Sequence, residues 1–147
     1  MAAHREGEPQ HYGRAVVVPR PFAATIDATR DALAEQGFGV LTEIDMAATM
    51  KAKLDVDLPP QVILGACNPP IAHRALQVEE SIGLLLPCNV VVRAVDERTT
   101  SVAVLDPQVM VAVTENPALA EVADEAATRI NAALARLGEL APEAATA

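Results

Sequence analysis

The stretch from Gly65 to Val92, GACNPPIAHRALQVEESIGLLLPCNVVV, decides the fold because it contains the end of one strand, a helix and the start of another strand. Residues 61–68, QVILGACN, are a short β-branched and small apolar run, which is typical of a buried strand. Asn68 followed by Pro69 predicts a helix start, with Asn as the N-cap and Pro at the first helical position. Residues 86–95, LPCNVVVRAV, predict the next strand.

The segment between these two strands has the periodicity of an amphipathic helix. At about 100° per residue, one face carries four apolar side chains, namely Ile71, Ala75, Val78 and Ile82. Gly83 predicts the end of this helix. His73 falls on the polar face, so we expect it to face solvent rather than to act as a base or a metal ligand.

Cys67 and Cys88 are the two cysteines of the chain, and each is followed by Asn and lies close to a proline. Cys67 falls where a strand meets a helix N-terminus, and backbone N–H groups at such a position favour a thiolate. Cys88 follows 21 residues later at the start of another strand, so it could be a spatial neighbour of Cys67. The spacing is neither CxxC nor a zinc pattern, and cysteine is often simply a buried apolar residue. The sequence leaves a reactive pair and two packed side chains as alternatives.

Working outward, the pattern predicts further elements on both sides of this stretch. Residues 12–18, 38–46 and 101–105 predict strands, the last one joined to the strand before it by the hairpin loop DERTT. Residues 22–36, 47–54 and 117–138 predict helices, the first closed by Gly37 and the last capped by Asn116. The last helix is expected to carry one apolar stripe along its length, from Leu119 to Leu137. Residues 108–113, QVMVAV, are expected to extend the last strand with a bend.

Glu43 and Asp45 are two carboxylates on one side of the strand 38–46. Alternation with a period of two places them there with Leu41, and it places Phe38, Val40, Thr42, Ile44 and Met46 on the other side. Such a pair can serve in acid–base chemistry or as ligands for a hard metal ion. Asp45 can equally cap the helix 47–54, and Glu43 can simply face water. Lys51 on that helix is a candidate for a salt bridge to these carboxylates or for anion binding.

The composition narrows the classes of function. The net charge is −9, from 11 basic and 20 acidic residues, and aromatic residues make up 2% of the chain, so we expect no nucleic-acid partner. The chain contains no signal peptide pattern and no segment of ~20 apolar residues, so we expect neither a membrane span nor export. Two cysteines do not make a disulfide framework, so the expected location is the cytoplasm with both thiols reduced.

The element order predicts an α+β fold, in which helices cover one face of a curved antiparallel sheet. We expect a flexible tail at residues 1–11, one domain at 12–138 and a second flexible tail at 139–147. The other face of the sheet would carry Val and Leu side chains, which favours a homodimer.

Two short motifs also carry a family resemblance. Gly65-Ala66-Cys67-Asn68-Pro69 and Leu86-Pro87-Cys88-Asn89-Val90, together with Glu43, Asp45, Lys51 and Asp106-Pro107, resemble the domain of unknown function 302 family between about Ala15 and Leu137. The resemblance implies a TATA-binding-protein-like topology, β-α-β4-α, and dimeric assembly. It implies no established activity, because fold alone does not fix function.

Two hypotheses follow. In the first, a pocket binds a small molecule or a metal ion, or carries out thiol chemistry, with Cys67 and Glu43 as catalytic groups. The residues expected to contact the ligand in that pocket are Asp45, Lys51, Asn68, Cys88 and Asn89. In the second, the chain is a non-catalytic dimeric module for a ligand or a protein, and its cysteines are structural. The sequence assigns no metal-ligand set, identifies no cofactor and leaves open whether the protein is an enzyme.

Overall fold

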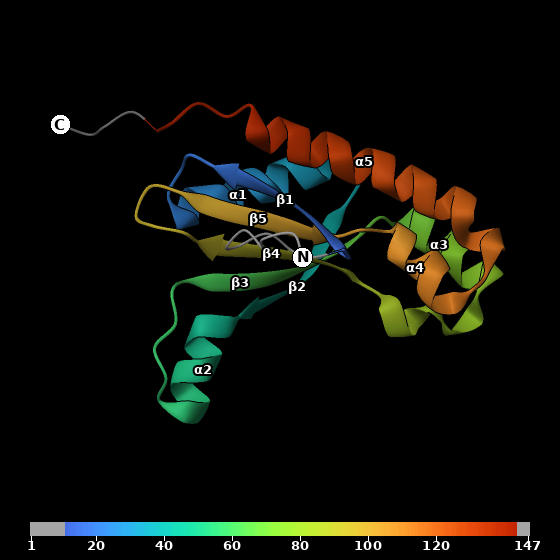
Figure 1. Cartoon of the computed structure of the whole chain (residues 1–147), viewed down its shortest axis with the longest axis horizontal. Helices are drawn as coiled ribbons and strands as arrows, with labels where there is room; N and C mark the ends of the chain where they lie inside the picture. The colour runs from blue at the N-terminus through green and yellow to red at the C-terminus, as the bar shows by residue number, and fades with distance from the viewer. Residues whose placement is uncertain (1–10, 144–147) are drawn as a thin grey trace, which may run out of the picture.

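The computed structural model describes residues 11–143, and within them the strands form one five-stranded antiparallel sheet (Figure 1). The strands are β1 (Gly13–Val18), β2 (Gly39–Asp45), β3 (Gln61–Cys67), β4 (Cys88–Ala94) and β5 (Thr100–Leu105). Their order across the sheet is β1-β5-β4-β3-β2, so the first two strands in the sequence are the two edges. Flexible tails were expected at residues 1–11 and 139–147. Residues 1–10 and 144–147 of these tails lie outside the described part of the chain.

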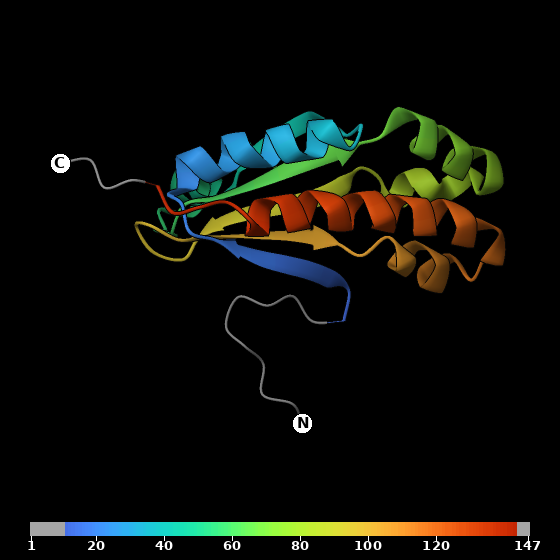
Figure 2. The same cartoon turned by 90° about the horizontal axis from the view of Figure 1, so that it is seen from above.

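Two long helices, α1 (Phe22–Glu35) and α5 (Ala120–Gly138), cover the same face of the sheet (Figure 2). With α1 between the first two strands and α5 at the end, the topology is the β-α-β4-α arrangement that the resemblance implied. The sheet core under these helices is mostly aliphatic, for example Val18, Leu33, Leu64, Val92, Val102 and Ile130. Each fully buried side chain of this size contributes about 1.5–3 kcal/mol relative to the exposed state.

The other helices are insertions in this frame. They are α2 (Met46–Leu54), α3 (Pro69–Val78), η1 (Glu80–Leu85), α4 (Gln108–Thr114) and η2 (Pro117–Leu119), where η is a 3₁₀ helix. Helices α3, η1 and α4 gather beyond one end of the sheet, beside the first half of α5, whereas α2 extends away from the edge of the sheet (Figure 1). No helix among residues 11–143 is both long enough and apolar enough to span a membrane.

The helices beyond the sheet have a buried cluster of their own, which we call the cap core. Its buried members are Ile71, Ala75, Ile82, Met110, Leu119, Val122 and Ala126. All of these residues come from helices, and α5 belongs to both cores because Ile130 and Leu137 pack in the sheet core. The apolar stripe expected on the last helix is therefore confirmed, and one stripe serves two cores.

The structure corrects two local predictions. Residues 108–113 form the helix α4 and not a strand extension: the Asp106 carboxylate accepts a hydrogen bond from the Gln108 N–H at 3.0 Å, and Met110 packs in the cap core. An apolar run of this length has no decisive period of its own, so tertiary packing selects the helix. Helix α3 ends at Val78, and Gly83 lies within the following 3₁₀ segment instead of ending the helix.

Strand β2 contains a bulge that changes which side chains share a face. Val40 lies opposite Ala66, Thr42 lies opposite Gly65, and Leu41 is the extra residue between them. After the bulge, Glu43 lies on the helix-covered face with Val40, while Thr42 and the following Ile44 lie on the open face. The expectation that Val40, Thr42 and Ile44 share one side is therefore wrong, because one extra residue inverts a period of two.

Candidate functional site

A cavity of about 270 Å³ lies between the end of the sheet and the helices of the cap. Its strand-side wall contains the last residues of β3, the first residue of β4 and the end of β5, namely Ala66, Cys67, Cys88 and Leu105. Phe38, just before the edge strand β2, and the bulged Leu41 within that strand also border the cavity. The motif residues around both cysteines therefore meet in space at one end of the sheet.

Helical side chains form the opposite wall. They belong to α3, η1, α4 and α5, and they include Ile71, Ala75, Leu85, Met110, Ala126 and Ile130. Since Ile71, Ala75, Met110 and Ala126 also belong to the cap core, and Ala66 and Ile130 to the sheet core, the cavity separates the two cores. Small alanine side chains on two helices leave this space unfilled.

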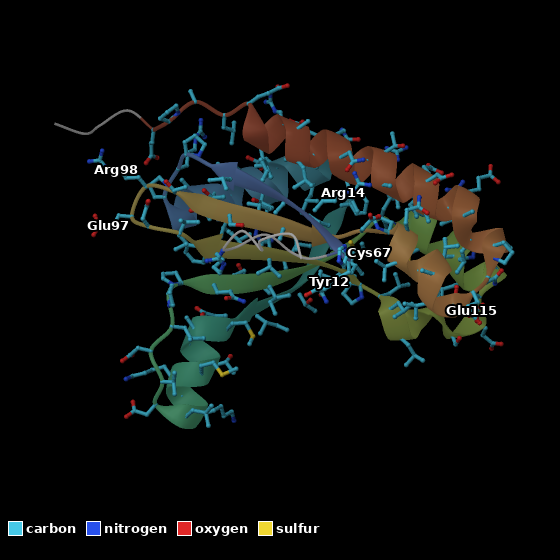
Figure 3. All side chains as sticks on the ribbon, viewed as in Figure 1. Tyr12, Arg14, Cys67, Glu97, Arg98 and Glu115 are labelled. Carbon is cyan, nitrogen blue, oxygen red and sulfur yellow. The ribbon has the colours of Figure 1, made fainter. Side chains whose placement is uncertain are left out.

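Cys67 is the last residue of β3 and directly precedes Asn68, the N-cap of α3, so it lies at the predicted junction of strand and helix (Figure 3). Its side chain is partly buried and lines the cavity, and its thiol is free. The strand register pairs it with Gly39 on the edge strand. Cys67 is therefore a thiol at the junction of strand, helix and cavity.

Asn68 is buried and is the N-cap that the sequence predicted. Its Oδ1 accepts a hydrogen bond from the Ile71 N–H at 3.4 Å, and its Nδ2 donates to the Gln36 carbonyl at 3.2 Å. Asn68 therefore joins the start of α3 to the end of α1. Gly37, with φ of 82°, provides the left-handed cap expected after α1 and approaches the Asn68 side chain.

Cys88 lies opposite Ala66 at the start of β4, so it belongs to the helix-covered face of the sheet. Burial of the thiol raises the pKa of Cys88 to about 11, because the apolar surroundings disfavour the thiolate. Its Sγ lies 3.9 Å from the Leu105 carbonyl oxygen, a distance compatible with a weak S–H···O hydrogen bond. Successive strand residues alternate in direction, so Cys67 and Cys88 approach the cavity from different faces of the sheet.

The predicted acidic and basic site residues lie elsewhere. Glu43 forms an ion pair with Arg30 of α1 at 3.2 Å, and the Asp45 Oδ1 caps α2 by accepting from the Ala48 N–H at 2.8 Å. Lys51 pairs with Asp55 at 2.8 Å and Asp57 at 3.2 Å, and not with the carboxylates of β2. Hydrogen bonds to those two aspartates raise the pKa of Lys51.

Of the seven predicted site residues, the structure brings Cys67, Asn68 and Cys88 to the cavity wall. Asn89 lies opposite Gly65 on the open face of the sheet and is exposed. Glu43, Asp45, Lys51 and Asn89 are not among the residues that line the cavity. Within residues 11–143, no group of three or more His, Cys, Asp or Glu side chains is placed to hold a metal ion.

Sequence reasoning missed most of the wall because that wall is apolar. Phe38, Leu41, Met110, Ala126 and Ile130 carry no chemical signature, and they come from segments up to 92 positions apart. The signal in the sequence was the small side chains on these helices, Ala72 and Ala75 in α3 and Ala126 in α5. Small side chains on facing helices can leave a space, but the sequence does not show which helices face each other.

The fold and this cavity define an α+β domain of TATA-binding-protein-like topology with an apolar cavity at one end of its sheet. The chain belongs to the DUF302 family: residues 14–137 match the domain described as "Domain of unknown function DUF302". A crystal structure of an uncharacterized conserved DUF302 protein from Bacillus stearothermophilus is similar, with 32% sequence identity and a TM-score of 0.79. The match covers 86% of this chain and 98% of that chain. No curated protein matches the chain.

Proposed function

We propose that the domain binds a small apolar molecule in the cavity between the sheet core and the cap core. The observation that carries this proposal is a cavity of about 270 Å³ whose wall is apolar apart from Asn68 and the two cysteines. Empty apolar space inside a protein forgoes dispersion contacts, and a ligand of matching size restores them. Natural ligand sites are likewise mostly apolar with few polar groups.

The size of the cavity limits the ligand. An engineered apolar cavity of about 150 Å³ is large enough for benzene, and drug-sized ligands occupy pockets of about 300–1,000 Å³. A cavity of 270 Å³ falls between these values. We therefore infer a ligand of roughly ten non-hydrogen atoms.

We propose that Cys67 and Cys88 contact this ligand through their sulfur atoms, which are soft and polarizable. Thiol chemistry at Cys67 is the enzymatic version of the proposal, and its partly buried position at the cavity supports access for a small reagent. Glu43 pairs with Arg30 and does not line the cavity, so in the enzymatic version it is not placed to act as a general base for the Cys67 thiol. Free thiols are consistent with our placement of the protein in the reducing cytoplasm.

The test is a binding titration followed by protein NMR, with 1-octanol and indole as neutral apolar probes. We expect saturable shifts of residues around the cavity. Ala126→Phe fills the cavity from α5 and should weaken binding at least tenfold, whereas Ala132→Phe, on an exposed position of the same helix, should not. Equal binding by both variants, with both folded, would locate the ligand elsewhere.

Mass-spectrometric alkylation of the native protein tests the thiol version. Cys67 should react before Cys88, because burial raises the pKa of the Cys88 thiol to about 11 and so keeps that thiol from forming the reactive thiolate. If a Cys67→Ser variant binds the apolar probes normally and retains every activity found in a substrate screen, the thiol version is wrong. Cys67 then only contacts the ligand.

We propose homodimerisation through the open face of the sheet as the second candidate property. The register aligns one apolar residue from each strand in a row across this face, namely Ala15, Ala103, Val91, Ile63 and Ile44. The long helices α1 and α5 both lie on the opposite face, so neither of them blocks a second copy from this row. In a two-fold dimer the same surface of both subunits forms the interface, so this row would pack against its copy in the second chain.

Light scattering coupled to size exclusion tests this assembly. The wild-type chain should elute as a dimer, Val91→Glu at the centre of the row should shift it toward monomer, and Thr128→Glu on an exposed position of α5 should leave it dimeric. A wild-type monomer at high micromolar concentration would exclude the dimer.

A further inference from the structure

Every side chain that lines the cavity is uncharged among the residues that the structure describes. Its hydrogen-bonding side chains are Asn68, Cys67 and Cys88. The Asn68 amide is already occupied at both ends, by the Ile71 N–H and the Gln36 carbonyl. The wall therefore offers a bound molecule two thiols and apolar surface.

The charged groups next to the cavity in sequence are paired with one another. Asp106, between the lining residues Leu105 and Pro107, lies 3.5 Å from Arg14 of β1. On the helical side, the Glu125 carboxylate binds Arg74 of α3 and lies 3.6 Å from Arg129. Arg14, Arg74 and Arg129 are thus partly neutralised by carboxylates. Each already has an acidic partner, so none is free to bind an anionic ligand.

Two electrostatic properties oppose a negative charge inside the cavity. The wall already disfavours the thiolate form of Cys88, whose pKa burial raises to about 11. The whole chain also carries a net charge of −9, which repels anions from its surface. Burial of a positive charge in the cavity is also unfavourable, because the wall contains no carboxylate to pair with it.

We propose that the cavity selects neutral molecules, with an apolar body and at most one weakly polar group, over carboxylates, phosphates and amines of the same size. This inference rests on the proposed function, since it names the chemical class of ligand for that same cavity. An uncharged hydrophobe loses little hydration on entry, whereas an ion gives up its water and finds no partner on the wall. The cavity therefore selects against ions because its wall has no charged group to pair with them, and not because of one specific contact with the neutral ligand.

Matched pairs of probes test the charge selection. At pH 7, 1-octanol is compared with octanoate and octylamine, and indole-3-ethanol with indole-3-acetate, so the members of each set are close in size and one linear and one flat scaffold are covered. We expect each neutral probe to bind at least tenfold more tightly than its charged partners. The loss of neutral-probe binding in Ala126→Phe assigns the binding to the cavity.

The possible outcomes separate the two proposals. If neutral and charged probes bind within threefold of each other, and Ala126→Phe removes both, the cavity binds small molecules but the neutral class is wrong. If no probe of either scaffold binds the wild-type chain, the proposed function fails, and the inference fails with it. Tighter binding of octanoate than of 1-octanol would also overturn the inference.

A charge placed on the wall provides a positive test. Leu85 of η1 is a partly buried lining residue, so Leu85→Lys can keep its ammonium group near water. This variant should gain at least tenfold in octanoate affinity relative to the wild type and should lose affinity for octylamine. Leu84→Lys, at the exposed neighbouring position, is the matched control and should change neither affinity. An unchanged preference in a folded Leu85→Lys protein would show that wall charge does not set the selectivity.

Discussion

Gly65, in the motif around Cys67, occupies a position with no room for a side chain. A Cβ atom there would overlap with the Oγ1 of Thr42 on β2 and would lie 2.8 Å from the Cγ of Pro87. Thr42 reaches this position because the bulge at Leu41 places it opposite Gly65. The glycine thus allows the edge strand and the Pro87 segment to approach β3 from two sides.

Gly65→Ala should lower the free energy of unfolding by about 1–3 kcal/mol, because overpacking forces the neighbours to move. Urea denaturation at constant pH measures this change. Gly39→Ala on the paired strand is the control, since a Cβ at Gly39 would meet nothing within 4 Å. It should be neutral or slightly stabilising, as strand glycines usually are when replaced by alanine. Equal effects of both changes would contradict the steric explanation.

Cys88 should make stability depend on alkaline pH. Its pKa is raised from 9.0 to about 11 in the folded protein, so between these values the folded state holds a proton that the unfolded state has lost. The contribution is therefore fully present below pH 9 and falls as the pH rises toward 11, by about 2–3 kcal/mol in total. Urea denaturation at several pH values measures the slope. Cys88→Ala should flatten it relative to the wild type, and an unchanged slope would contradict the assignment to Cys88.

At the scale of elements, the N-terminus of α3 connects the cavity to the rest of the fold. Asn68 caps α3 and also bonds to the Gln36 carbonyl at the end of α1, so one amide fixes the relative position of two helices. Asp45 caps α2 in the same way, but both it and its helix are exposed. The two caps have similar local geometry and different tertiary roles.

Asn68→Ala should therefore cost about 1–3 kcal/mol of stability, because it removes the cap and one of the two side-chain donors to the part-buried Gln36 carbonyl, the other being Arg129. Asp45→Ala should cost less, about 1 kcal/mol or below, because water replaces an exposed cap. Thermal or urea unfolding of the two variants gives the comparison. A larger loss from Asp45→Ala would show that the Gln36 contact contributes nothing.

At the scale of the whole molecule, two cores share one helix. The sheet core is supported by four strand pairings and two long helices, whereas the cap core consists of short helices around the first half of α5. The cavity lies between the two cores, so side chains of the sheet core and the cap core make fewer contacts with one another there. The two cores should therefore differ in local stability.

Native-state hydrogen exchange should show this difference. Amides of α3 and α4 should open at lower free energy than amides of β4 and β5, because the cap core is small and borders a cavity. A neutral probe that binds the cavity should raise protection in the cap, by about 2.7 kcal/mol at 100 times its Kd. Uniform protection across both cores, or no response of the cap to a bound probe, would contradict the two-core description.

The sequence by itself determined the features that depend on local chemistry. The Asn68 and Asn116 caps, the hairpin between β4 and β5, and the stripe along α5 follow from residues a few positions apart, and the structure confirms each. The α+β class followed from the order of these elements. Family resemblance supplied the topology, which local periodicity does not specify.

Only the tertiary structure decided the features that depend on distant residues. The bulge at Leu41 reassigned the faces of β2, packing against α5 made residues 108–114 helical, and Arg30 of α1 paired with Glu43. The cavity itself arises where Phe38, Ala66, Met110 and Ala126 fail to fill a common space. Caps and periodicity act over one or two turns of chain, whereas a cavity is a property of how separate segments pack, and no single segment encodes it.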